Sequence, residues 1–516
     1  MGFSSVDYVI LIAYLLGITA FGVMFRNTQR SATDYFVGNK NTHWFVICAS
    51  IVATETSTLT LIGIPAIAYA NYQFPEQGGN FAFLQIVFGY IVARFIISVL
   101  FIPAYFKGDL QTAYKLLENR FGGSVKNAAA SLFMVVRAVG DGVRTFAASI
   151  VIAAVLAFSL PDFPQLAVVS ILIVGILTLI YTYQGGLIAV LWTDLIQLVI
   201  YVSGAVIAAV IVWNAIPGGW EEIRSVASAG NKFEFVSFEL DFTVPFTFWA
   251  GLIGGTFLTT ASHGTDQMLV QRLLACRNES DAKMAIITSG FIILFQFALL
   301  LFVGVLLYVF YSHFTLADSS LAAANCLAER KCDGIFPKFI VEQLPTGVAG
   351  LMIAALTAAA MSTLSSSLNS LASSSILDFY KPLVNPDADD QKLLKLSRWL
   401  TAVWGVILIS IAFLSQGVGS VLTFGLSIAS LIYGPMLGAF LLGVLTKRAN
   451  GTGVVVGMVA SLISMVLIWN LTPIAWTWYV LIGTCICFSV GYLVSLVIGN
   501  GEPAPETEHP SDRSDL

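Results

Sequence analysis

The sequence has few charged residues. Only 11% of its 516 residues are Asp, Glu, Lys or Arg, whereas 57% are hydrophobic and the mean hydropathy is +0.85. Soluble globular proteins carry about 25% charged residues, so this composition excludes a chain whose surface lies mostly in water. The sequence also lacks a phosphate-binding loop. We therefore expect an integral membrane protein in a lipid bilayer, with no nucleic-acid partner.

Cysteine is sparse as well. Four of the six cysteines lie in or beside apolar segments, where a cysteine is usually a small core residue. The other two, Cys326 and Cys332, share a polar loop. A disulfide between them requires that this loop be extracytoplasmic, and the sequence leaves the pairing open.

Apolar runs dominate what is present. Thirteen of them approach or exceed the roughly 20 residues that a helix needs to cross a bilayer. None has the short alternating pattern of a membrane barrel strand. No basic region precedes the first run, so we expect a retained helix rather than a cleaved signal peptide. The segments are 7–26, 42–70, 81–106, 126–157, 164–184, 187–214, 245–270, 282–312, 345–378, 396–415, 418–444, 452–471 and 474–498.

Basic residues predict the orientation. With the N-terminus outside, 17 of the 25 Lys and Arg residues fall on the cytoplasmic side, as the positive-inside rule requires. The C-terminus is then cytoplasmic, and segments 215–244 and 313–344 are outer loops. We expect a multi-pass protein of the cell membrane (plasma or inner), with a transmembrane domain at 1–498 and a disordered cytoplasmic tail at 499–516.

The second segment carries a carboxylate at membrane depth. In 49-ASIVATETSTLTLIGIPAIAYA-70, Glu55 lies among five threonines and serines. Because proline has no backbone donor, Pro65 predicts a disrupted helix with free carbonyls upstream. Broken helices at this depth line cavities and form ion and substrate sites in transporters. A simple proline kink is the alternative, but the cost of burying Glu55 favours a functional site.

The ninth segment contains a polar stripe, 361-MSTLSSSLNS-370. Residues three and four apart share a helix face, so Ser362, Ser365, Ser366 and Asn369 align, with Thr363 at the edge. Hydroxyl and carbonyl oxygens are hard ligands that suit an alkali cation. A helix-packing surface of small residues is the alternative, and the stripe alone slightly favours it. The broken helix beside it favours the ion site.

Two further segments carry charge within the bilayer. Asp194, in the sixth, needs a cation or a hydrogen-bond partner, which a neighbouring helix could also supply. The fourth carries Arg137, Asp141 and Arg144, which are spaced so that they can neutralise one another. Otherwise one arginine is free to hold a substrate carboxylate, and Arg137 is our candidate.

The seventh segment ends in 259-TTASHGTDQMLVQR-272, before a basic inner loop. His263 could sense protons. A plain hydrogen-bonded histidine is the favoured interpretation.

Several of these stretches together resemble the sodium:solute symporter family, which includes sodium/glucose, sodium/proline and sodium/sialic acid cotransporters. The resemblance covers nearly the whole chain. It rests on 103-PAYFKGDLQTAYKLLENRFG-122, 186-GGLIAVLWTDLIQ-198, the TDQ and QR motifs of the seventh segment, and above all 354-AALTAAAMSTLSSSLNSLASSSILDFY-380.

The resemblance implies an all-α integral membrane fold of about thirteen helices with a LeuT-like five-plus-five inverted repeat, at about 42–214 and 245–444. It implies Na+ as the coupling ion. Carried over by position, the main Na+ site comprises the carbonyls of Ala53, Thr56 and Ala359 and the hydroxyls of Ser362 and Thr363. A second Na+ site, present in some members, corresponds to Asp194, Ser362, Ser365 and Ser366.

Substrate positions transfer less closely. Besides Arg137, the candidates are Glu55, Ser57, Thr60, Phe81, Gln85, Thr259, Ser262 and His263. Sugar-binding members have a short polar side chain or an amide in place of Glu55, and an aromatic pair of some sugar carriers is Ser262–His263 here. These departures favour a carboxylate, an amino acid or a sialic-acid-like anion. A sugar or polyol is the alternative.

Other classes fit the sequence less well. A channel would lack a closed solute site, and a transporter-like sensor would need a cytoplasmic signalling domain. An intramembrane enzyme would need a nucleophile or a metal-ligand set beside His263 and Asp266, and none accompanies them. We therefore expect a secondary active transporter, functional as a monomer, that couples Na+ influx to uptake of a small organic solute by alternating access.

Overall fold

The computed structural model describes residues 3–25, 35–36, 40–72, 78–107, 110, 112–159, 165–316, 318–328, 332–416 and 421–499. Within these ranges the chain forms helices, and its β-structure is limited to an isolated bridge between Thr42 and Cys276. Apart from Gly499, the predicted tail 499–516 lies outside the described residues.

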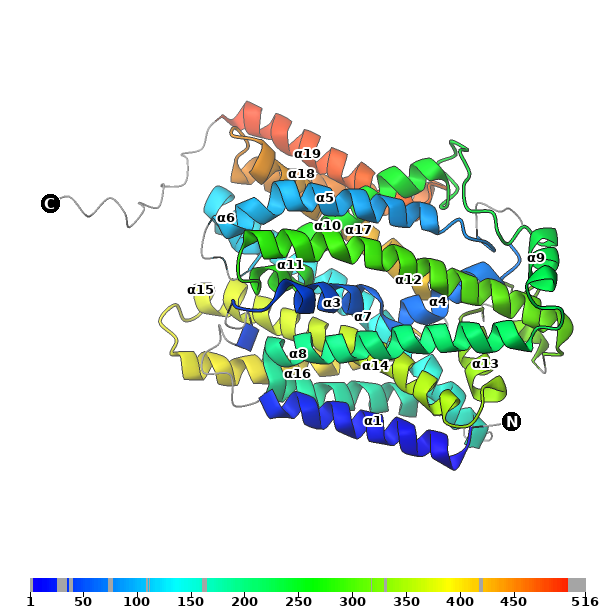
Figure 1. Cartoon of the computed structure of the whole chain (residues 1–516). Coiled ribbons are helices and arrows are strands. Elements are labelled where there is room, and N and C mark those ends of the chain that lie inside the picture. The colour runs from blue at the N-terminus through cyan, green and yellow to red at the C-terminus, as the bar shows by residue number, and fades with distance from the viewer. Residues whose placement is uncertain are drawn as a thin grey trace.

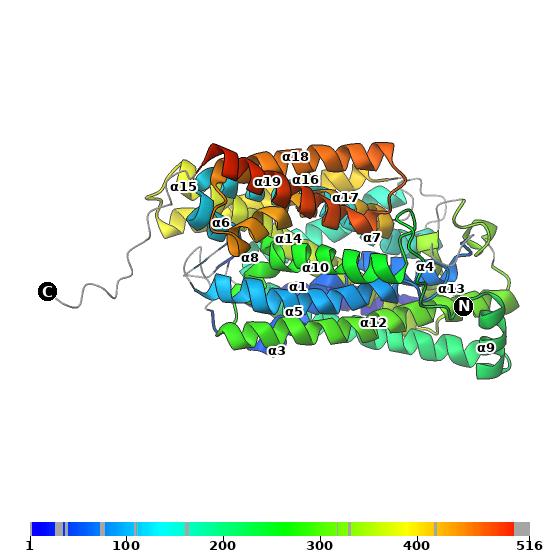
Figure 2. The same cartoon turned by 90° about the horizontal axis from the view of Figure 1, so that it is seen from above.

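Long helices lie side by side along a roughly common direction (Figures 1 and 2). They are α1 (Ser5–Met24), α5 (Leu84–Phe106), α7 (Gly123–Ser159), α8 (Leu166–Ala215), α12 (Glu279–His313), α14 (Val348–Ser374), α16 (Asp390–Leu414), α17 (Val421–Leu445), α18 (Gly451–Leu471) and α19 (Tyr479–Ile498). The shorter helices are α3 (Trp44–Glu55), α4 (Thr58–Tyr69), α6 (Tyr114–Phe121), α9 (Gly219–Ala229), α10 (Gly255–Gly264), α11 (Gln267–Leu274), α13 (Ile335–Gln343) and α15 (Lys381–Leu383). Two π-helical stretches, η3 (Ala250–Gly254) and η6 (Ser375–Tyr380), and three 3-10 turns, η4 (Ser319–Leu321), η5 (Cys332–Gly334) and η7 (Trp476–Trp478), complete the set.

In the described part of the chain, ten helices are long and apolar enough to span a membrane, and the bent pair α3–α4 makes eleven. Two predicted segments account for the difference from thirteen. One is the first part of α8, a shorter apolar helix at Leu166–Ile180 that precedes a break at Gly186. The φ of 59° at Gly186 favours glycine. The other is the run of η3, α10 and α11. The count of thirteen stays a prediction.

The predicted broken helix is present, and its break lies upstream of Pro65. Helices α3 and α4 meet at 58°, and the chain leaves helical geometry at Thr56 (φ −89°, ψ 74°). Pro65, in contrast, lies inside the continuous helix α4. The hydroxyl-rich run 54-TETST-58 explains the position, because threonine and serine side chains compete for backbone hydrogen bonds and weaken a helix.

A second break lies at the corresponding place in the second predicted repeat. Helix α10 ends at Gly264, and α11 starts after Asp266, whose carboxylate accepts a hydrogen bond from the Met268 amide at 2.9 Å. A broken helix near the start of each half is the arrangement found in inverted-repeat transporters. The repeat boundaries at about 42–214 and 245–444 stay a prediction.

Helix α14 lies at the centre of the bundle. Almost all its residues are buried, and it contacts α1, α3, α7, α8 and α16. Its many alanines and serines explain this position, because small side chains let neighbouring helices approach closely inside a membrane protein. The polar stripe of α14 therefore faces protein rather than lipid.

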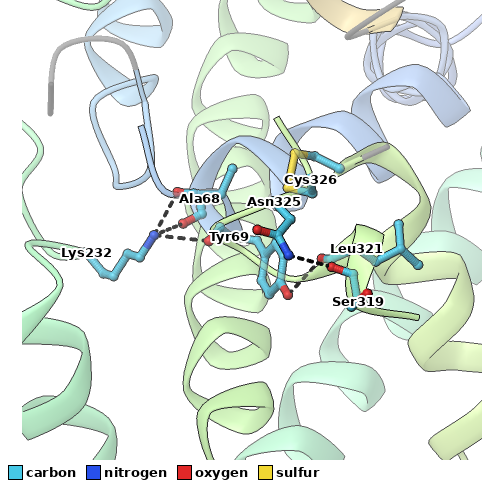
Figure 3. Close-up of a disulfide and its surroundings, with 9 residues drawn as sticks. Ala68, Tyr69, Lys232, Ser319, Leu321, Asn325 and Cys326 are labelled. Carbon is cyan, nitrogen blue, oxygen red and sulfur yellow. Dashed lines mark hydrogen bonds between the residues drawn. A yellow bond between two sulfur atoms is a disulfide. The ribbon is translucent and has the colours of Figure 1, made fainter. Parts of the chain in front are cut away.

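The two ends of the bundle differ. Helices α6 and α15 lie at one end, and α9, α13 and the N-terminal end of the chain lie at the other (Figure 1). Beside α4 at the α9 end, Cys326 and Cys332 form a disulfide (Figure 3). The pairing that the sequence left open is thus made. Tyr69, the last residue of α4, donates a hydrogen bond from its hydroxyl to the Leu321 carbonyl in the same loop, at 3.0 Å.

Lys232, in the loop after α9, caps the end of α4. Its Nζ donates to the carbonyls of Ala68, Tyr69 and Ala70 at 3.3, 3.1 and 2.8 Å (Figure 3). The ammonium also lies 4.1 Å from the centre of the Tyr308 ring. A cation at this place is favourable because the last carbonyls of a helix have no helical donor and carry partial negative charge.

Candidate functional site

The break between α3 and α4 exposes backbone carbonyls. Helical hydrogen bonding resumes at Ser57, whose carbonyl accepts from the amides of Thr60 at 2.9 Å and Leu61 at 3.0 Å. Among the described residues, no donor reaches the carbonyl oxygens of Ala53 and Thr56. Both belong to the predicted main Na+ site. Bare, buried carbonyls are suitable ligands for a hard cation.

Helix α14, which carries the remaining predicted main-site residues, contacts the start of α4. Thr58, at the start of α4, donates from its hydroxyl to the Leu356 carbonyl of α14 at 2.7 Å. About two turns further along α14, the Thr363 hydroxyl donates to the Ala359 carbonyl at 3.2 Å, and the Ser362 hydroxyl donates to Asp194 at 2.5 Å. The hydroxyl oxygens keep lone pairs for a cation. The donor set is chemically suited to Na+.

The predicted second Na+ site is already occupied by an arginine. The Arg272 guanidinium, from α11, lies 3.3 Å from the carboxylate of Asp194 and donates to the hydroxyl of Ser366. Ser50 donates to the same carboxylate at 2.5 Å and accepts from Arg272 at 2.8 Å. The fourth predicted ligand, Ser365, donates to the Ser362 carbonyl at 2.9 Å. A Na+ ion here would have to displace the guanidinium.

A cavity lies beside the break, between α4, α5, α7, α10 and α17. It is lined by seven of the nine predicted substrate residues, namely Glu55, Ser57, Thr60, Arg137, Thr259, Ser262 and His263. Phe81 and Gln85 do not line it. The Phe81 ring contacts Phe233 instead, and the Gln85 amide donates to the Phe246 carbonyl at 2.7 Å, holding the loop before η3.

Arg137 is held by acidic neighbours. It donates to Asp266 at 2.9 Å and to the Tyr433 hydroxyl at 3.0 Å, and it lies 3.7 Å from Asp141. Arg144 also pairs with Asp141, at 2.6 Å, so the mutual neutralisation considered from the sequence is present. However, the Arg144 side chain keeps 28% of its surface exposed, against 5% for Arg137.

Glu55 has a partner that sequence reasoning missed. It forms a salt bridge with Arg94 of α5, whose side chain is only 1% exposed. Arg94 lies in the middle of α5 and is buried, so its side chain does not extend to the membrane surface.

The cavity contains other residues that were not among the predicted substrate positions. Arg144 was considered with Arg137 and Asp141, but Arg137 was chosen as the candidate; Arg144 lies seven residues from Arg137 on the same face of α7 and also lines the cavity. Helix α17 contributes Leu422, Leu426 and Tyr433 at helical spacing. The sequence did not indicate that these residues line the cavity, because no sequence pattern places α17 beside the break.

The family model of the sodium:solute symporters matches residues 35–461. The chain belongs to the sodium:solute symporter family. The sodium/sialic acid symporter NanT of Aliivibrio fischeri is 30% identical over 99% of this chain and 96% of its own length. The sodium-coupled monocarboxylate transporter 2 of Mus musculus is 29% identical over 89% and 71%.

Solved structures agree with this assignment. A substrate-bound, outward-open Na+-coupled sialic acid symporter superimposes with a TM-score of 0.82 at 28% identity, covering 96% of this chain and 98% of its own. A nucleobase-cation-symport-1 family transporter shares the fold, with a TM-score of 0.55 at 13% identity over 91% and 95% of the two chains. The chain is thus a multi-pass Na+-coupled symporter and not an enzyme, as predicted.

Proposed function

We propose that this symporter takes up a hydroxyl-bearing organic carboxylate of the sialic-acid type. The observation that carries the proposal is Arg144, the most exposed of the arginines at the cavity. The charges of Arg137 and Glu55 are already engaged by Asp266 and Arg94. Arg144 pairs with Asp141 through one terminal nitrogen but keeps 28% of its side chain exposed, so its remaining donors can receive a substrate carboxylate through a bidentate pair.

The remaining wall suits hydroxyl groups. Ser57, Thr60, Thr259 and Ser262 present short polar side chains to the cavity. The Nε2 atom of His263 is buried there, 3.4 Å from the Glu55 carboxylate. A substrate with several hydroxyls would satisfy these groups. Two relatives named as sodium/sialic acid symporters, each 30% identical to this chain, support the same substrate class.

Na+ would drive uptake from the main site. An ion bound by Ala53, Thr56, Ala359, Ser362 and Thr363 would hold the break against α14 and complete the adjacent cavity. One charge crossing 100 mV supplies about 2.3 kcal/mol, and a tenfold gradient adds about 1.4 kcal/mol. Because the charges of one Na+ and one carboxylate cancel, the potential does not drive a one-to-one cycle, and one ion supports about tenfold accumulation of the anion. The protein would work as a monomer, with its N-terminus outside and its C-terminus in the cytoplasm.

We propose a second Na+ site only for a conformation different from the one described. Asp194, Ser362, Ser365 and Ser366 can hold a second ion only in a conformation in which Arg272 has withdrawn. With two ions the cycle carries one net positive charge, so the membrane potential also contributes and accumulation of the anion rises to roughly several thousandfold.

The test is uptake of radiolabelled N-acetylneuraminic acid into proteoliposomes, with an inward Na+ gradient or with K+ in its place. We expect accumulation that requires Na+. Arg144→Gln should lower the affinity for this acid by roughly 10-fold or more, because a charged hydrogen-bonded pair contributes about 1.5–3 kcal/mol. Lys392→Gln, on the exposed start of α16, is the matched control.

Equal uptake in K+ would contradict the coupling of this transport to Na+. A sugar or polyol is the second candidate, favoured by the hydroxyl-rich wall alone. It predicts that Arg144→Gln leaves affinity nearly unchanged and that a neutral sugar is accumulated as well as the acid.

A further inference from the structure

Arg94 lies where a charge is costly. It is the eleventh of the 23 residues of α5 and is 1% exposed, and it does not line the cavity. A charged side chain in the middle of a membrane helix must be paired or must serve a function. Neither the family match nor the predicted Na+ and substrate residues explain it.

The surroundings of Arg94 hold it in one position. Its Nε donates to the Ser289 hydroxyl at 3.0 Å, and one terminal nitrogen donates to the Tyr90 carbonyl at 3.1 Å. Opposite its chain, Gly290 leaves the space it needs, because a Cβ atom there would lie 2.7 Å from the Arg94 Cδ. Helices α5 and α12 together thus form a fitted place for this guanidinium.

The other terminal nitrogen of Arg94 forms the salt bridge to Glu55 at the break. Glu55 is 11% exposed and lines the cavity, and the His263 Nε2 atom lies 3.4 Å from its carboxylate. The carboxylate therefore faces the substrate while the guanidinium lies behind it. Seen from the cavity, the two charges cancel.

This cancellation matters for an anionic substrate. Two like charges within about 10 Å repel by roughly 1–2 kcal/mol at an effective dielectric constant of about 20. Like-charge contacts are a common means of rejecting a ligand. Without its partner, the carboxylate of Glu55 would oppose the carboxylate that Arg144 is proposed to attract.

We propose that Arg94 sets the charge selectivity of the cavity by neutralising Glu55 from behind. Arg94 is thus a positioning residue that never touches the substrate. Glu55 is left to accept hydrogen bonds from substrate hydroxyls without repelling the anion. The inference rests on the proposed function, because it requires that the substrate carry a carboxylate.

The experiment measures a selectivity ratio in proteoliposomes. N-acetylneuraminic acid and its neutral methyl ester each compete against labelled acid, and the ratio is the inhibition constant of the ester divided by that of the acid. We expect Arg94→Gln to lower this ratio by about tenfold or more, as expected for one uncompensated unit charge. Glu55→Gln, which leaves Arg94 in excess, should raise it. The double variant Glu55→Gln with Arg94→Gln should return it to within about threefold of the wild-type value.

A purely structural role for Arg94 gives a different pattern. It would weaken the acid and the ester together, leave the ratio unchanged and give no recovery in the double variant, and this result would overturn the inference. Gly290→Ala offers an independent way to displace the guanidinium and should shift the ratio in the direction of Arg94→Gln. If Arg94→Gln does not fold, Glu55→Gln and the double variant decide, since an unchanged ratio in Glu55→Gln also overturns the inference.

The failure of the proposed function is recognisable separately. A thermal-shift screen of the wild-type protein in Na+ against sugars, amino acids, monocarboxylates and sialic acid identifies the carboxylate that binds. If this is another carboxylate, only the proposed substrate is wrong, and the ratio is measured with that acid and its amide. If no carboxylate binds, both proposals fail.

Discussion

Two neighbouring places in this symporter have the composition of a Na+ site, yet they differ in what their oxygen atoms already contact. At the break, the carbonyls of Ala53 and Thr56 have no donor among the described residues. At the second place, the carboxylate of Asp194 accepts from Ser50 and Ser362 and pairs with Arg272. Both places are buried in the same part of the bundle.

The difference shows that ligand type alone does not define a cation site. A Na+ ion is favoured where oxygen atoms accept no other hydrogen bond. A broken helix produces such atoms, because the carbonyls at the break lose their amide donors. A stripe of hydroxyl side chains does not by itself produce such free oxygen atoms, since serine and threonine can hydrogen-bond to their own helix backbone or to a nearby carboxylate. Ser362 belongs to both predicted Na+ sites, and its hydroxyl already donates to Asp194.

The largest effect should follow from breaking the ion pair of the second place. Asp194→Asn leaves the Arg272 guanidinium buried without its counter-charge, which should destabilise the fold by about 3–5 kcal/mol. We expect little monodisperse protein in detergent, measured by size-exclusion chromatography and thermal melting. The double variant Asp194→Asn with Arg272→Gln should recover most of the lost stability, because replacing a buried pair is often close to neutral.

The opposite outcome would change the comparison. If Asp194→Asn folds like the wild type and alters only the steepness of the Na+ dependence of uptake, Asp194 acts mainly as an ion ligand. Arg272 would then be a secondary contact of that site.

A smaller effect is expected at the main site. Thr363→Ala removes one predicted ligand beside the bare carbonyls and should raise the Na+ concentration for half-maximal uptake at least about threefold, or roughly 0.7 kcal/mol. Ser365→Ala is the matched control on the same helix, since its hydroxyl donates to the Ser362 carbonyl. It should leave the Na+ requirement nearly unchanged while Arg272 holds the second place. A larger effect in Ser365→Ala than in Thr363→Ala would reverse the ranking of the two places.

Much of the fold could be predicted because membrane helices leave strong local signals. Long apolar runs and rare buried charges identified the broken helix and α14. The position of the break was less predictable. Pro65 was the stronger signal in the sequence, but the run of threonines around Thr56 interrupts the helix instead.

The candidate site could be predicted only in part, for a similar reason. Glu55 and Asp194 both required partners, yet a single sequence does not tell which of the 25 basic residues supplies them. The partners are Arg94 and Arg272, which lie on other helices and are far away in the chain. Pairing across a bundle depends on packing, and no helical spacing encodes it.

Lys232 extends the comparison to a third set of carbonyls, those at the end of α4, where the cation is a lysine of the loop after α9. Burial lowers the pKa of Lys232 from 10.5 to about 7. Below pH 7 this lysine is protonated in both the folded and the unfolded chain, and above about 10.5 it is neutral in both. Between these values the unfolded chain binds a proton that the folded chain does not.

The free energy of unfolding should therefore rise with pH between about 7 and 10.5, by at most about 1.4 kcal/mol per pH unit. Lys232→Met should remove this rise from melting temperatures measured between pH 7 and 9, whereas Lys447→Met, at an exposed position, should keep it. If the wild type and Lys232→Met show parallel pH dependence, the lysine keeps its proton throughout this pH range and caps α4 as a fixed cation.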